Sequence, residues 1–116
     1  MDVNRPKLRW SWEELPIVKQ FEGASFQAVS GEKGTVARFH LAKGTKTPPS
    51  KHVQEQFTYV IKGRLRYEVD GQQVLVEAGD MIYVGSNRIH RAEVLEDSIV
   101  LDFFSPAWTD IPNRPK

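Results

Sequence analysis

Short runs of β-branched and aromatic residues, separated by glycine, proline and aspartate, recur along almost the whole chain. Long amphipathic helical patterns are scarce, and short runs with this spacing are typical of a β-sandwich or a β-barrel. The sequence therefore predicts an all-β protein. The expected strands span residues 16–21, 25–30, 35–42, 56–62, 64–70, 72–77, 81–85, 90–96 and 98–105.

The segments between the runs carry residues suited to tight turns. Lys62-Gly63, Asp70-Gly71 and Asp97-Ser98 offer positive φ or side-chain hydrogen bonds, so we expect neighbouring strands to pair antiparallel. Residues 43–52 differ, because this segment is long and polar and is stiffened by Pro48-Pro49. We interpret it as a loop that holds His52 in a fixed place.

The chain of 116 residues falls within the usual size of one domain. Its 40% hydrophobic and 27% charged residues are typical of a folded globular protein. We expect a single domain over 1–116, with a core at about 16–105, an N-terminal arm at 1–15 and a C-terminal tail at 106–116. A domain this short gains stability from a partner chain, so we also expect a homodimer.

Charge and cysteine content exclude several classes of function. The chain has 16 Lys and Arg against 15 Asp and Glu, without the clustered basic charge of a nucleic-acid-binding protein. Without cysteine it has no disulfide, thiolate metal site or cysteine nucleophile. No stretch approaches the ~18–20 apolar residues of a membrane span, and no apolar signal region opens the chain. We expect a cytoplasmic protein whose partners are neither nucleic acid nor membrane.

Two polar residues stand out at strand positions. Strand side chains alternate between two faces, so Gln56 shares a face with Thr58. If His90 faces inward, Ala92 and Val94 do too, while the charged residues between them face solvent. This alternation favours an interior position for His90.

Three further polar residues are candidates for a pocket. Asp102 lies between apolar residues of the same face. It is therefore either an interior carboxyl group with a raised pKa that acts as an acid or base, or a residue on a solvent-exposed face. Arg38 and His40 share one face of their strand. If that face is interior, both line a substrate pocket and Arg38 can clamp an anion. Otherwise both lie on the outer sheet surface.

The segment around His52 resembles the first motif of the cupin superfamily, which places two His and one Glu between two Gly. Gln56 lies seven residues before Gly63, in the place of the Glu. His52 lies four residues before Gln56, in the place of the second His. Ser50 occupies the place of the first His, and we expect it to be a further residue of the substrate pocket.

The segment at 77–94 resembles the second cupin motif. Gly79 matches the leading Gly, and His90 matches the motif His. Gly85 and Asn87 stand where Pro and Gly are usual, and Val94 stands for Asn.

The resemblance spans roughly residues 35–104 and implies a cupin-type jelly-roll β-barrel, also called a double-stranded β-helix or RmlC-like fold. The most similar members are single-domain cupins with Gln in place of Glu, of the uronate-ketonizing, pectin-degradation type. Their last strand reads Asp-x-Phe-Ser-Pro, which "DFFSP" at 102–106 repeats, so the resemblance makes Asp102 a catalytic residue. Their catalytic Arg falls at Trp108, which is a departure from the pattern.

The chemistry of the residues points the same way. Two imidazoles and an amide oxygen can bind one face of a first-row divalent ion and leave other positions open for water or substrate. We expect His52, Gln56 and His90 to hold Mn, Fe, Ni or Zn. Because all three ligands are neutral, the ion keeps its +2 charge and favours an anionic substrate. The alternative is that both histidines are hydrogen-bonded residues of a barrel without metal.

The sequence thus predicts a small-molecule-binding cupin, a divalent-metal-dependent enzyme of the isomerase, lyase or dioxygenase type. The expected ligand is a small polar sugar-acid or keto-acid-like compound. One alternative is a metal-free ligand-binding or sensor cupin with a degenerate metal site, which Ser50 favours. Another is a purely structural dimer. Trp108 either fills a core or an interface, as large aromatic residues usually do, or caps the pocket mouth.

Overall fold

The structure is a computed structural model that describes residues 7–109. All the predicted strands are confirmed, with ends within two residues of the expected ones, and a single 3₁₀ turn (Trp12–Glu14) precedes them in the described part. The strands are β1 (Val18–Phe21), β2 (Ala24–Ser30), β3 (Thr35–Leu41), β4 (Glu55–Lys62), β5 (Arg64–Val69), β6 (Gln72–Glu77), β7 (Met81–Val84), β8 (His90–Val94) and β9 (Ser98–Ser105). Residues 1–6 of the predicted arm and 110–116 of the predicted tail lie outside the described residues.

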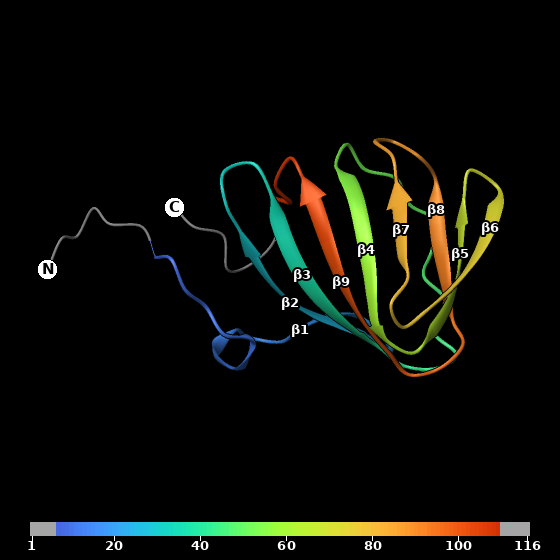
Figure 1. Cartoon of the computed structure of the whole chain (residues 1–116), viewed down its shortest axis with the longest axis horizontal. Helices are drawn as coiled ribbons and strands as arrows, with labels where there is room; N and C mark the ends of the chain where they lie inside the picture. The colour runs from blue at the N-terminus through green and yellow to red at the C-terminus, as the bar shows by residue number, and fades with distance from the viewer. Residues whose placement is uncertain (1–6, 110–116) are drawn as a thin grey trace, which may run out of the picture.

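Two antiparallel sheets form a jelly roll (Figure 1). The larger sheet has the strand order β1-β2-β3-β9-β4-β7, and the smaller has the order β6-β5-β8. Neighbouring strands pair antiparallel only at β1–β2, β2–β3 and β5–β6. The expectation that this holds along the whole chain is therefore wrong, since β4 pairs with β9 and β7, and β8 pairs with β5.

The reason is the jelly-roll connection, in which the chain repeatedly crosses from one sheet to the other. Gly63 joins β4 of the larger sheet to β5 of the smaller one, so the predicted Lys62-Gly63 turn is a crossover and not a hairpin. Its φ of 99° lies in the left-handed region that glycine adopts without strain.

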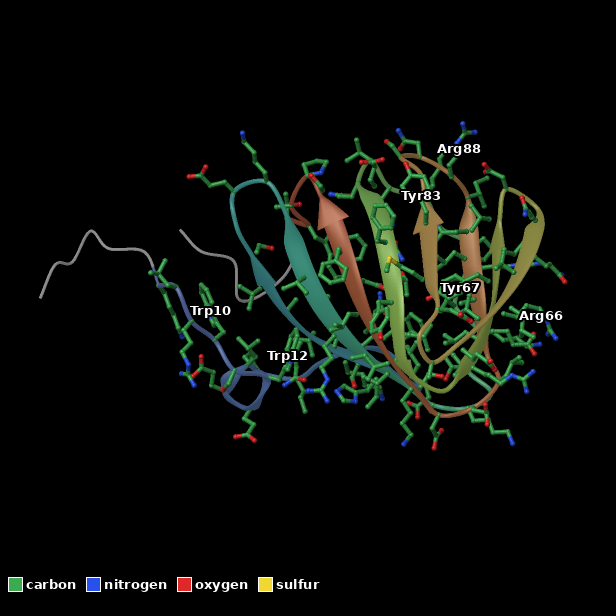
Figure 2. The ribbon with its side chains drawn as sticks, viewed as in Figure 1. Trp10, Trp12, Arg66, Tyr67, Tyr83 and Arg88 are labelled. Carbon is green, nitrogen blue, oxygen red and sulfur yellow. The ribbon has the colours of Figure 1, made fainter. Side chains whose placement is uncertain are left out.

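The hydrophobic core lies between the two sheets. Buried and more exposed side chains alternate along β3, β4, β7 and β9 of the larger sheet, and Gln56, Thr58 and Val60, which were predicted to share a face of β4, are buried. His90, Ala92 and Val94 of β8 are buried, so the predicted interior position of His90 is confirmed. Figure 2 shows the same alternation on β5, where Arg66 lies on the outer side and Tyr67 on the inner side.

The polar segment at 43–52 is held along the edge of β8. Its backbone hydrogen-bonds β8 through Gly44, Thr45 and Thr47, and Ser50 and His90 exchange two backbone hydrogen bonds of 3.0 and 2.9 Å. The prediction that this segment fixes His52 is thereby given a physical basis, because β8 sets its register.

The N-terminal segment covers part of the outer face of the larger sheet. The buried Gln27 side chain of β2 donates hydrogen bonds to the backbone carbonyls of Trp12 at 2.6 Å and Leu15 at 3.1 Å. Trp12 lies at the lower end of the sheet in Figure 2. No helix in residues 7–109 is long and apolar enough to cross a membrane.

Candidate metal and ligand site

A cavity of about 300 Å³ opens between the two sheets and the 43–52 segment. Its polar lining comes from both cupin-like segments and from β9. The residues that form this polar end are Ser50, His52, Gln54, Gln56, His90 and Asp102. An apolar wall adjoins this end, and it includes four aromatic rings, those of Phe21, Phe39, Phe104 and Trp108.

The structure brings His52, Gln56 and His90 together although the histidines are far apart in the chain. The ring centroids of His52 and His90 lie 4.9 Å apart in an edge-on arrangement. His52 Nε2 lies 3.2 Å from Gln56 Oε1. Two ligands bound at right angles to one first-row divalent ion lie about 3 Å apart, so this separation suits a shared ion.

The remaining nitrogens of both rings are oriented by backbone carbonyls. His52 Nδ1 lies 3.0 Å from the Gln54 carbonyl, and His90 Nδ1 lies 2.9 Å from the Arg88 carbonyl. Donation from Nδ1–H to a carbonyl leaves Nε2 with its lone pair free, which is the arrangement found behind metal-bound histidines.

Gln56 presents its amide oxygen to His52 because its nitrogen is already engaged. Gln56 Nε2 donates to Thr58 Oγ1 at 2.8 Å, which turns Oε1 toward the ring. With the neutral Nδ1–H tautomer of His52, two lone pairs then face each other across 3.2 Å without a proton between them. A cation at this place satisfies both atoms, so the residues fit a divalent metal.

Asp102 lies at the end of the same hydrogen-bonded chain. Thr58 Oγ1 donates to Asp102 Oδ1 at 2.5 Å, and Asp102 is 7% exposed. Burial raises the pKa of Asp102 to about 7, against a smaller lowering by the Thr58 hydrogen bond. Of the two alternatives in the sequence, the structure selects an interior carboxyl, poised near neutral pH.

Two residues near these hydrogen-bonded side chains also have shifted pKa values. Burial raises the pKa of Tyr67, and the nearby Asp102 carboxylate acts in the same direction, so Tyr67 stays a neutral phenol. Burial also lowers the pKa of His90, while its hydrogen bond to the Arg88 carbonyl opposes that shift. A neutral His90 is the form that binds a metal.

Sequence reasoning missed Thr58, Tyr67 and Gln54 as site residues. The alternation places Thr58 on the same face as Gln56 without giving it a role, and Tyr67 reads from the sequence only as a strand-forming residue. Gln54, which its position before the strand indicated to be solvent-facing, is buried and donates to the Ala107 carbonyl at 3.4 Å. Gln54 lies two residues before Gln56, so it shares the buried face of β4. Extending the alternation of β4 by two residues toward the N-terminus would have predicted that Gln54 is buried.

The structure does not bring Arg38 and His40 to the cavity, which corrects the expectation that they line it. The inner face of β3 is formed by Ala37, Phe39 and Leu41, so Arg38 and His40 face outward. The Arg38 guanidinium lies 5.8 Å from the centre of the Trp12 ring, under the N-terminal segment. Burial and the Arg38 charge both lower the pKa of His40.

Ser50 lines the cavity beside His90. Its hydroxyl group is a weaker ligand for a first-row metal than the histidine that the cupin motif has at this position. Within residues 7–109 no group of three or more His, Cys, Asp or Glu side chains is placed to hold an ion. Any metal here therefore depends on the Gln56 amide as its third protein ligand.

Trp108 packs within the apolar wall. Its ring centroid lies 5.2 Å from that of Phe104, 5.3 Å from Phe26 and 6.4 Å from Phe39. Its backbone N–H donates to the buried Thr35 hydroxyl at 2.8 Å. Trp108 therefore packs against the core, as the first alternative expected, and it also lines the cavity.

Comparison with known proteins agrees with this architecture. The chain is 33% identical over 73 residues to the pectin degradation protein KdgF of Dickeya dadantii. The aligned residues make up 61% of this chain and 66% of that relative, which is just under two thirds of the relative's length. The structure of an RmlC-like cupin from Shewanella frigidimarina superposes with a TM-score of 0.84 at 26% identity, covering 90% of this chain and 96% of that one.

The structure of KdgF from Halomonas sp. matches with a TM-score of 0.80 at 25% identity, over 84% of this chain and 92% of that one. Oxalate decarboxylase from Bacillus subtilis, described with Mn(II) centres, matches in fold alone, with a TM-score of 0.77 at 19% identity over 88% of this chain and 30% of that one. The family model for the cupin domain matches residues 37–104, which is more than half of the sequence. The chain therefore belongs to the cupin family.

Proposed function

We propose that this cupin binds a small keto-acid-like or sugar-acid-like molecule at a divalent metal and transforms it by proton transfer. His52, Gln56 and His90 hold the ion. The observation that carries the proposal is the pair of facing lone pairs on His52 Nε2 and Gln56 Oε1, 3.2 Å apart and fixed in that orientation by hydrogen bonds behind them. The similarity to KdgF, a pectin degradation protein, supports an enzyme over a purely structural dimer.

When bound, the metal supplies Lewis-acid polarisation of a carbonyl or enol oxygen. Asp102 is the group that takes up or releases the proton. Thr58 donates to Asp102 Oδ1, so the proton of the neutral carboxyl resides on Oδ2. Because Asp102 lines the cavity and its pKa is about 7, both of its protonation states are accessible at neutral pH, as a general acid or base requires.

The first test is metal content. Protein purified without chelator is expected to carry, or to take up from added Mn, Fe, Ni or Zn, one ion per chain, as measured by elemental analysis. The His90→Ala variant removes one of three protein ligands and is expected to lose at least about 90% of that metal, since each ligand is needed in a site with so few. A wild-type protein that stays free of metal with all four ions contradicts the proposal.

A second candidate is a metal-free ligand-binding or sensor cupin. Ser50 in the cavity and the neutral donor set favour it, because a buried ion without a charged ligand is retained weakly. A thermal-shift panel of sugar acids and keto acids, run with and without metal, separates the two. Ligand-induced stabilisation that persists in chelator, of about 2–3 kcal/mol at a hundredfold excess over the dissociation constant, identifies the metal-free form.

We also propose a single-domain homodimer that works in the cytoplasm. The outer face of β4, β7 and β9 carries large apolar side chains that are 36–62% exposed, and contiguous surfaces of this kind mark interaction sites. Cross-strand pairing of Phe57 with both Tyr83 and Phe103 makes the face continuous. We call it the apolar outer face. Its residues are Phe57, Tyr59, Ile61, Met81, Tyr83 and Phe103.

A further inference from the structure

The cavity is divided into a polar end and an aromatic wall, and the two adjoin. The His52 ring lies edge-on to Phe104 with centroids 5.7 Å apart, and Phe104 lies 5.2 Å from Trp108. Phe39 continues the wall below Trp108, and Phe21 of β1 lies at its half-buried edge. The aromatic wall therefore begins within one ring of the predicted metal ligands.

The cavity offers little to a second charge or to a ring of hydroxyl groups. Arg91 is the one Lys or Arg among the described residues that line it, and its guanidinium is engaged by Glu68 at 2.7 Å on the outer side. Most of the hydrogen-bonding side chains lie at the polar end. Of the others that line the cavity, Gln20 is exposed on β1, the Thr47 hydroxyl accepts from the Ala92 N–H at 2.8 Å, and Tyr67 is buried. A sugar acid carries hydroxyl groups along its whole carbon skeleton, and those facing the aromatic wall lose their hydrogen bonds to water without replacement.

We propose, on the basis of the proposed function, that the substrate is a small aryl-substituted keto acid or its enol, and not a sugar acid. Its carboxylate and keto oxygens face His52, Gln56, His90 and Asp102, and its ring lies against Phe104 and Trp108. A planar ring stacks favourably on such a wall. At about 300 Å³, the cavity is at the small end of ligand sites, which suits a single ring joined to a short acid chain.

Trp108 is the specificity-determining residue in this arrangement. Its ring is held by three aromatic neighbours and by the hydrogen bond from its backbone N–H to Thr35, so the wall is present before the ligand binds. A preformed surface costs the ligand no ordering free energy.

The experiment compares the binding of phenylpyruvate, pyruvate and galacturonate by isothermal titration calorimetry, with Mn²⁺-loaded and with EDTA-treated protein. Phenylpyruvate and pyruvate share the keto-acid group and differ in the ring, so the ratio of their affinities measures the wall alone. We expect phenylpyruvate to bind at least about tenfold more tightly than pyruvate. We expect galacturonate to bind more weakly than phenylpyruvate.

Trp108→Ala is expected to reduce the phenylpyruvate-to-pyruvate ratio to about threefold or less. Trp10→Ala is the matched control, because Trp10 contacts Lys7 in the N-terminal segment and does not line the cavity. Circular dichroism checks that each variant is folded. If Trp108→Ala does not fold, Phe21→Ala at the edge of the wall takes its place, with the same expected direction.

The outcomes separate this inference from the proposed function. A ring-dependent ratio in a protein that binds no metal supports the aromatic wall and contradicts the metal-dependent activity. Metal binding combined with a ratio near one, with tighter binding of galacturonate, or with no binding of any of the three compounds overturns the inference and leaves the metal site standing. A ratio that the folded Trp108→Ala variant leaves unchanged also overturns it.

Discussion

At the scale of single residues, the site depends on one hydroxyl group. Thr58 accepts from Gln56 Nε2 and donates to Asp102 Oδ1, and so it orients the predicted metal ligand and the predicted proton-transfer group together. A hydroxyl that both accepts and donates fixes the direction of each bond. Without it the Gln56 amide is free to rotate and turn its nitrogen, in place of its oxygen, toward the proposed metal position.

Thr58→Val removes the hydroxyl and keeps the shape of the side chain. We expect the affinity for Mn²⁺ to fall about 10- to 100-fold, as for other residues that orient a metal ligand. Titration calorimetry measures this without reference to activity. Ser98→Ala is the control, because it removes another buried hydroxyl, one bonded to the Glu96 carbonyl at the far end of β9. Equal affinities in wild type and Thr58→Val contradict an orienting role.

The buried Asp102 makes stability depend on pH. Its pKa of about 7 in the folded state is above the ordinary aspartate pKa of 3.8, so between these values the folded state binds a proton that the unfolded state has released. The contribution of Asp102 is therefore fully present below about pH 3.8 and is lost as pH rises toward 7, by at most about 1.4 kcal/mol per pH unit. The lowered pKa of His90 acts in the opposite direction, because the unfolded state binds the extra proton there.

Comparison with Asp102→Asn isolates the carboxyl from the other groups. Urea unfolding of chelator-treated protein is expected to show that wild-type stability, relative to this variant, declines from pH 4 to pH 7 and levels off above. A difference between the two proteins that is constant over this range contradicts the raised pKa of Asp102.

At the scale of elements, the crossover between β4 and β5 is the most constrained point of the chain. A Cβ at Gly63 lies 2.6 Å from the Asp97 carbonyl oxygen and 2.7 Å from Ser98 Cα, which are backbone atoms that do not move aside easily. The turn between β8 and β9 therefore packs directly against this glycine, and the two sheets are joined there.

Gly63→Ala is expected to lower the free energy of unfolding by about 3 kcal/mol or more, from the positive φ and the backbone overlap together. Gly71→Ala provides the matched control, because Gly71 also has a positive φ, of 82°, but no atom lies within 4 Å of its added Cβ. We expect it to cost about 1–2 kcal/mol. Chemical denaturation measures both, and similar losses for the two variants contradict close packing at the crossover.

At the scale of the whole molecule, the apolar outer face predicts the oligomeric state. Phe103 is 45% exposed on β9, which borders the β4 part of this face, and it pairs with Phe57 of β4 and Val36 of β3. Phe103→Asp places a charge in the proposed interface, and we expect it to weaken dimerisation about 30-fold or more, as for other interface hot spots. Light scattering with size-exclusion chromatography detects the change.

Leu75→Asp is the control for this prediction. Leu75 is 52% exposed on the outer side of the smaller sheet, away from the apolar outer face. It is expected to leave the dimer intact. A wild-type protein that is monomeric at micromolar concentration contradicts the proposed homodimer.

The strands and their inner faces were predictable from the sequence, because alternation and turn residues are local properties. His90 was assigned correctly to an inner face for this reason, and Gln56 was placed on the same face as Thr58, while Asp102 was left between an inner and a solvent-exposed position. The face of β3 was left open, although Ala37, Phe39 and Leu41 form an apolar face and Arg38 and His40 lie on the other one with Val36. The burial of the apolar face in the sheet shows that Arg38 and His40 face outward.

The strands, the presence of a turn at Gly63 and the residue types available for a metal follow from local sequence patterns. Which of these residues meet depends on tertiary packing. The hydrogen bonds between the 43–52 segment and β8 carry His52 to within 4.9 Å of His90, and the pairing of β4 with β9 places Thr58 opposite Asp102. Neither contact is encoded locally, because each depends on the register between strands distant in the chain, and that register is set by packing of the whole core.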